Sequence, residues 1–108
     1  MNLELAQQIV PTYEKHGWTL QRVLWRPSAE RERQQIAQTF PEASLIDSKI
    51  DALWFARASN AGREAWELRL IAEQKYALFE AFEADEGEED REDARREMEK
   101  KMRDYAGA

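Results

Sequence analysis

The chain has 108 residues, of which 43% are hydrophobic and 35% are charged, and its 22 acidic and 16 basic side chains give a net charge of −6. A chain of this length forms one domain with a single modest core. The absence of cysteine excludes disulfides, thiolate nucleophiles and cysteine-based zinc sites, and it fits a reducing, cytoplasmic location. The longest apolar run, residues 52–56, is far shorter than the roughly 20 residues of a membrane span, and the first residues lack the pattern of a secretory signal.

The negative charge is concentrated near the C-terminal end. Residues 83–104 carry 11 acidic and six basic side chains, whereas the rest of the chain is nearly neutral. A negative field repels phosphate groups, so the charge disfavours nucleic acids and anionic membrane surfaces as ligands.

The first segment, residues 3–16, has the spacing of an amphipathic helix. Leu5, Ile9 and Tyr13 recur every four residues and form one apolar stripe. Gly17 favours a stop directly after this segment. Pro11 removes a backbone donor in the middle of it, so we expect a kink or two short helices.

Residues 18–26 alternate in the manner of a strand and end at Pro27. Ser28 is a suitable N-cap for a second helix that extends to about Thr39. More than 20 residues, including this helix, separate the first strand from Ile50. This distance predicts that the strand starting at Ile50 is a parallel neighbour of the first.

Three further strands are predicted at 50–58, 64–72 and 76–83. The short connections between them favour hairpins, so the three form an antiparallel meander. The third segment also satisfies helical spacing, and a single long helix over 77–105 is the competing prediction.

The last element is a charged helix from about Glu88 to Tyr105. Its acidic residues cluster in the first half and its basic residues in the second half, which complements the helix dipole. Its narrow apolar stripe includes Met98 and Met102.

These elements together predict an α+β fold with two layers. A helix, a strand and a helix precede the three-stranded antiparallel meander, and the four strands form one mixed sheet. Residues 1–83 make up the domain, and residues 84–108 form an acidic hinge and the charged C-terminal helix, which can pack on the domain.

No pattern in the sequence predicts a catalytic, cofactor-binding or metal-binding site. His16 is the only histidine and lies at a predicted helix end, where a cation is favourable without any catalytic role. The acidic run at 85–90 does not have the ligand spacing of an EF-hand loop, and the four glycines are too scattered for a phosphate-binding loop.

Both faces of the predicted sheet carry large apolar side chains. We expect the first two helices to cover one face, formed by Trp18, Leu20, Leu24, Trp54, Trp66, Leu68, Leu70, Tyr76, Leu78 and Phe82. The other face then carries Val23, Trp25, Leu53, Phe55, Ile71 and Phe79. Because such a face is too hydrophobic to remain open to water, either the C-terminal helix or another protein covers it.

These observations predict a non-enzymatic domain that binds another protein or a second copy of itself. The candidate interface residues lie on the second sheet face and on the C-terminal helix: Trp25, Leu53, Phe55, Phe79, Met98 and Met102. Two alternatives remain open. One is a small enzyme or ligand-binding domain with a pocket between sheet and helices, and the other is an acidic regulator whose tail mimics nucleic acid.

Overall fold

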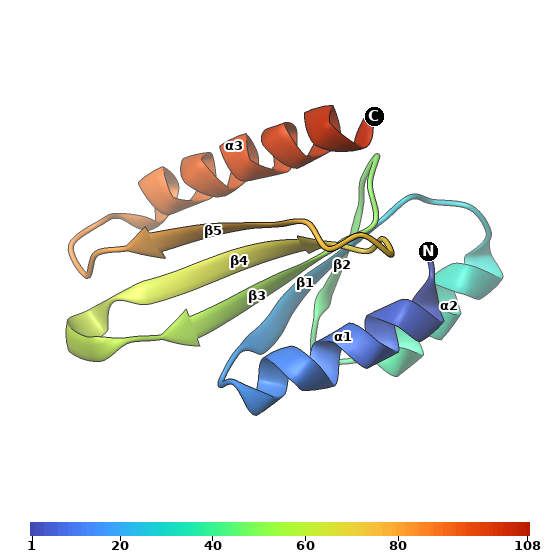
Figure 1. Cartoon of the computed structure of the whole chain (residues 1–108), viewed down its shortest axis with the longest axis horizontal. Coiled ribbons are helices and arrows are strands. Elements are labelled where there is room, and N and C mark those ends of the chain that lie inside the picture. Colours follow the sequence, from blue (N-terminus) through green and yellow to red (C-terminus); the bar gives the residue numbers. More distant parts are fainter.

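The computed structural model describes residues 1–108, and in it three helices enclose a five-stranded sheet (Figure 1). The elements are α1 (Leu3–Lys15), β1 (Thr19–Trp25), α2 (Glu30–Thr39), β2 (Ser44–Asp47), β3 (Ala52–Ala58), the 3-10 turn η1 (Asn60–Gly62), β4 (Glu64–Leu70), β5 (Ala77–Phe82) and α3 (Glu88–Ala106). The predicted α+β class is confirmed, and so is the predicted order of its elements. The structure differs from the prediction in several details, of which the first are a fifth strand and a third layer, since helices cover both faces of the sheet.

The strands lie in the order β2-β1-β3-β4-β5. Strands β3, β4 and β5 form the predicted antiparallel meander, and β5 is a strand and not the start of a long helix. The additional strand is β2, which pairs in parallel with β1. Its four residues include only two large apolar side chains, which is too short a pattern to predict a strand.

The predicted parallel pairing of the first strand with the strand at 50–58 is wrong. β1 and β3 are antiparallel, with Val23 opposite Leu53. The strand that lies parallel to β1 after the crossover through α2 is β2. From there the chain passes the end of β1, where the Ser48 amide donates to the Trp25 carbonyl over 2.9 Å, and β3 returns on the other side.

A bulge in β1 changes which way its side chains point. Leu20 pairs with Phe55 and Arg22 pairs with Trp54, so Gln21 is an extra residue in the ladder. Leu20 therefore shares the face of Phe55, although simple alternation places it with Leu24 on the other face. Trp18 also packs on the Phe55 side, and its predicted place beside Leu24 is wrong for the same reason.

The helices cover the two faces in the opposite sense to the prediction. α1 and α2 pack on the face that carries Val23, Trp25, Leu53 and Phe55. α3 lies across the opposite face, and its apolar stripe completes a core that includes Leu24, Trp54, Trp66, Leu68, Leu70 and Phe82. Figure 1 shows α3 on one side of the sheet and α1 with α2 on the other. For the strand residues that follow the bulge, the predicted division between two faces is confirmed. The predicted assignment of helices to these faces is wrong.

Both N-terminal helices differ slightly from their predicted form. α1 is one helix that continues through Pro11, with the Asn2 side chain accepting from the Leu5 amide at its start. The buried Ala6 and Val10 precede the proline and Tyr13 follows it, and all three pack against the same core, so packing on the sheet holds the helix together. The residue at the N-cap of α2 is Ala29 and not Ser28, whose hydroxyl instead bonds the Glu32 carboxylate.

Polar groups as well as apolar ones attach α3 to the sheet. Met98 and Met102 are buried in the core beneath it. The Trp54 indole donates to Glu99 over 2.9 Å, and the buried Arg95 guanidinium lies 4.2 Å from the centroid of the Trp66 ring. The C-terminal helix is therefore part of the folded body.

Candidate functional site

On the face of the sheet that packs against α1, the part formed by β4 and β5 is only partly covered. Phe79 on β5 is 56% exposed, which is the largest exposed fraction among the big apolar side chains. Glu67 on β4 is its direct cross-strand neighbour. We use the term open face for the surface formed by Tyr13, Trp18, Glu67, Phe79 and Ala81.

A row of four aromatic rings links the core to the open face. The Tyr13 ring stacks on Phe55 with a centroid distance of 4.0 Å and an interplanar angle of 4°. Trp18 meets Tyr13 edge-on at 6.2 Å, and Phe79 meets Trp18 edge-on at 6.3 Å. Because Phe55 is fully buried, the row gives the exposed Phe79 ring a rigid support.

Polar contacts hold the two middle rings of this row in place. The Tyr13 hydroxyl donates to the Glu67 carboxylate, and burial together with this carboxylate raises the pKa of Tyr13. The Arg57 guanidinium lies 4.6 Å from the centroid of the Trp18 ring and donates to the His16 carbonyl over 3.2 Å. The open face is thus largely preformed in the folded chain.

The open edge of β5 adds unpaired backbone groups to this surface. The Leu70 amide donates to the Tyr76 carbonyl over 2.9 Å, which sets the phase of the β4–β5 ladder. Backbone groups of alternate residues point to opposite edges of a strand, so those of Leu78 and Glu80 face β4. The amides and carbonyls of Ala77, Phe79 and Ala81 therefore face away from the sheet, at its free edge.

A small pocket of about 290 Å³ lies beside the open face, lined by Thr12, Tyr13, His16, Trp18, Glu67 and Lys75. It contains the only histidine, but this side chain is exposed. The Tyr13 hydroxyl and the Glu67 carboxylate are already bonded to each other. No third side chain of the pocket bonds to this pair, which holds the Tyr13 ring in place.

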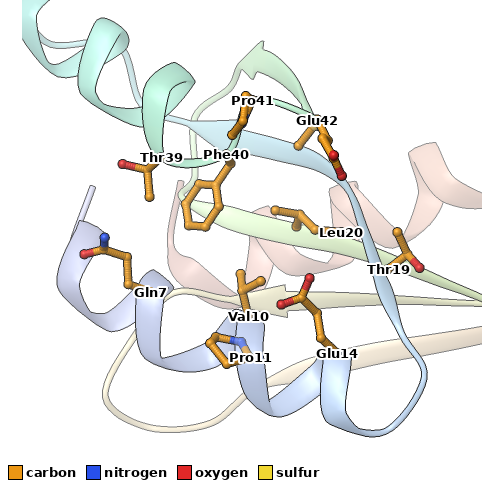
Figure 2. Close-up of a pocket in the computed structure, with 11 residues that line it drawn as sticks. Gln7, Val10, Pro11, Glu14, Thr19, Leu20, Thr39, Phe40, Pro41 and Glu42 are labelled. Atoms are coloured by element: carbon orange, nitrogen blue, oxygen red, sulfur yellow. The ribbon is translucent and has the colours of Figure 1, made fainter.

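A groove of about 390 Å³ lies between α1 and the turn that leads from α2 into β2 (Figure 2). Val10 and Pro11 on α1 face Phe40 across it, and Leu20 on β1 lies beside them. The carboxylates at this groove, Glu14 and Glu42, are exposed to solvent. It brings apolar side chains together without a buried acid or base.

The six predicted interface residues lie in three places. Trp25, Leu53 and Phe55 are buried beneath α1 and α2, and Met98 and Met102 are buried between α3 and the sheet. Phe79 alone is exposed. The predicted hydrophobic face is therefore covered within the chain, and only its margin on β5 is accessible.

Four residues of the open face were missed as candidates: the aromatic Tyr13 and Trp18, and Glu67 and Ala81 beside them. Tyr13 was predicted to lie on the apolar stripe of α1, and it does so while its hydroxyl reaches Glu67. Trp18 was predicted to lie in the core on the other face, because nothing in its sequence context signals the bulge at Gln21.

Other features of the chain provide no further centre. Nowhere do three or more His, Cys, Asp or Glu side chains come together in a way that could hold a metal ion. None of the helices combines the length and the apolar character needed to cross a bilayer. The acidic residues at the start of α3 are exposed, while the two arginines of the same segment, Arg91 and Arg95, point into the fold.

Comparison with known proteins identifies no relative. No protein-family model matches the chain, and neither a curated protein nor a solved structure matches it.

Proposed function

We propose that this chain is a protein-binding domain that engages its partner through the open face and the free edge of β5. The observation that carries the proposal is the position of Phe79, an exposed aromatic side chain on an edge strand whose backbone groups are unpaired. An extended segment that pairs with such an edge gains backbone hydrogen bonds, while side chains beside the edge supply specificity.

The surroundings of Phe79 support this role. Trp18 extends the aromatic surface, while Arg57 at the Trp18 ring and Lys75 in the adjoining pocket place charges beside it. Aromatic anchors surrounded by polar groups are typical of the residues that contribute most to interface energy. No element of the chain pairs with β5 on its outer side.

A photo-crosslinking amino acid, p-benzoylphenylalanine, at position 79 tests the proposal in the cells that make the protein. A matched probe at Arg96, which is exposed on the outer side of α3, controls for random collision. We expect a discrete crosslinked species from position 79 and none from position 96. Equal yields from both positions, or no product at all, would contradict the proposal.

A second variant ties the crosslink to the β5 edge. The Ala81 amide faces away from β4, so Ala81→Pro removes a donor at the free edge without breaking the internal ladder. We expect this change to abolish the crosslink from position 79. Ala81→Ser, which keeps the amide, is the control and should preserve it.

The two alternatives have weaker support. A ligand-binding or catalytic role would use the pocket beside His16, where Tyr13 and Glu67 satisfy each other. An acidic mimic would use the exposed carboxylates of α3, such as Glu89 and Asp90. Because deletion of 84–108 would expose the core, Glu89→Gln with Asp90→Asn is the appropriate test of the mimic. A cytoplasmic location remains a prediction from the cysteine-free composition.

A further inference from the structure

We infer that the partner at the β5 edge is a second copy of this chain, bound through antiparallel pairing of the two β5 strands about a two-fold axis at Phe79. This inference rests on the proposed function and gives it a specific occupant. A two-fold axis at the centre of an antiparallel pair makes the same patch complementary to itself. Both the backbone groups and the side chains of β5 are complementary to themselves in this way.

The backbone groups fit the pairing at Phe79. With the axis at this residue, Phe79 lies opposite its own copy and Ala77 lies opposite Ala81 of the second chain. These three residues are the ones whose amides and carbonyls face the free edge. The phase of the ladder therefore allows these three residues to pair only with one another. The side chains decide among the registers that remain, because an axis at Glu80 would oppose two like charges, whereas the axis at Phe79 opposes none.

The side chains that meet are compatible at every position. The two Phe79 rings become direct cross-strand neighbours, and the small Ala77 and Ala81 on the same face leave room for them. On the other face Leu78 lies opposite Glu80, so no two like charges are directly opposed.

The charges at the two ends of the paired segment are complementary. Lys75 precedes β5 by two residues and Glu83 directly follows it, and both lie four residues from Phe79. The axis therefore places Lys75 opposite Glu83 of the second copy, twice in each dimer. Opposite charges in this position stabilise a strand pair, whereas like charges would destabilise it.

The rest of the fold tolerates this arrangement. The two-fold axis is perpendicular to the sheet, so β5 of the two copies joins them into one ten-stranded sheet with both α3 helices on the same side. The two α3 helices then run antiparallel. Each end of the dimer therefore carries the acidic first half of one helix, 88–93, and the basic second half of the other, 95–103.

An interface made by one edge strand is small, so we expect a weak dimer with a Kd of about 10–100 μM. Sedimentation equilibrium of the full chain from about 5 to 500 μM, a range chosen to bracket that Kd, measures it. The mass should rise from 12.7 kDa toward twice this value. A chain that stays monomeric at the highest concentration overturns the inference.

Charge exchange tests the register. Lys75→Glu and Glu83→Lys each create two like-charge pairs, and each should raise the dimer Kd by about tenfold. The double exchange restores opposite charges and should return the Kd to within about threefold of the parent value. Single variants without effect, or a double variant weaker than both, would exclude this register. Glu83 also pairs with Arg63 in the monomer, so thermal melting of each variant checks its fold.

Amide hydrogen exchange supplies an internal control. On dimer formation, the amides of Ala77, Phe79 and Ala81 should become protected, while those of Leu78 and Glu80 are already protected by β4. Concentration-dependent protection confined to another element would place the interface elsewhere and refute the inference.

The crosslinking experiment separates this inference from the proposed function. A product of twice the chain mass from position 79 supports both. A product with a different protein, from a chain that sediments as a monomer, leaves the protein-binding function and removes the self-pairing. The absence of any product from position 79 removes both.

Discussion

The Arg22 guanidinium on β1 donates through both of its terminal nitrogens to the two carboxylate oxygens of Glu92 on α3, over 2.8 and 2.9 Å. This paired contact joins residues 70 positions apart and connects the last helix to β1, an interior strand of the sheet. Glu92 also lies 3.5 Å from Nε of Arg95. Because both side chains of the Arg22–Glu92 pair are partly shielded from solvent, the interaction is stronger than a typical surface ion pair.

Glu92 makes the stability of the fold depend on acid. The hydrogen bonds from Arg22 lower the pKa of Glu92 from 4.5 to about 2. Since the folded-state pKa lies below that of the unfolded chain, the pair stabilises the fold above about pH 4.5, and this contribution is lost as the pH falls toward 2. After allowance for solvent screening, we expect Glu92→Gln to lower the free energy of unfolding by about 1–2 kcal/mol at pH 7.

Urea denaturation of both proteins at several pH values measures this difference. The gap between parent and Glu92→Gln should narrow steadily below pH 4.5 and vanish near pH 2. Glu97→Gln, on an exposed position of the same helix, is the control and should show no such gap. If the difference in unfolding free energy between the two proteins does not change with pH, the ion pair is not its cause.

Arg95 is 1% exposed, and its Nε and Nη1 atoms have no hydrogen-bond partner. Its guanidinium stacks on Trp66, so its packing contributes as well as its charge. We expect Arg95→Met to preserve the free energy of unfolding within about 1 kcal/mol or to raise it, because an unbranched apolar side chain fills the space without a desolvation cost. Arg95→Ala leaves a cavity and should cost about 2–4 kcal/mol. Equal losses for the two variants in chemical denaturation would show that the charge matters more than the volume.

Phe55 and Phe79 stand at opposite ends of the aromatic row and give a matched pair of substitutions. Phe55→Ala removes a fully buried ring and should lower the free energy of unfolding by about 3–5 kcal/mol. Phe79→Ala removes a largely exposed ring that meets Trp18 edge-on and should cost at most about 1 kcal/mol. Measurements at low micromolar concentration keep any self-association out of the comparison. A large loss for Phe79→Ala would assign this ring to the fold and not to binding.

The bulge at Gln21 predicts an unusual tolerance to deletion. Without Gln21, Leu20 still lies opposite Phe55 and Arg22 still lies opposite Trp54, so both flanks keep their faces. We expect this deletion to cost no more than about 2 kcal/mol. Deletion of Val23 instead moves Arg22 opposite Leu53 beneath α1, which buries its charge and should cost more than about 3 kcal/mol. Thermal melting of the two deletion variants compares them directly, and similar losses would contradict the role of the bulge.

Local patterns in the sequence were sufficient for most of the elements. The alternation of Trp66, Leu68 and Leu70 with Glu67 and Arg69 predicts β4, and the structure has a strand there. The charge gradient and the methionine stripe predict α3 in nearly its observed length. The candidate site could not be predicted to the same extent. Of the six predicted interface residues, Trp25, Leu53 and Phe55 lie beneath α1 and α2, and Met98 and Met102 are buried on the inner side of α3.

The exchange of faces has a physical cause. Both sides of the sheet are rich in apolar side chains, so hydrophobicity alone does not decide which helix covers which side. The preference for right-handed crossovers determines which face α2 covers, but only when the position of the parallel strand is known. That strand is β2, and its short segment carries too little pattern to be recognised.

The sequence by itself determined the class of the fold, the order of most elements and the two sets of apolar residues, because periodicity and turn residues act within a few positions along the chain. Only the tertiary structure decided the remaining features: the fifth strand, the bulge at Gln21, the side on which α3 packs, and the exposure of Phe79 beside Trp18. These depend on contacts between residues far apart in sequence, where one extra residue in a ladder reverses the face of every side chain before it.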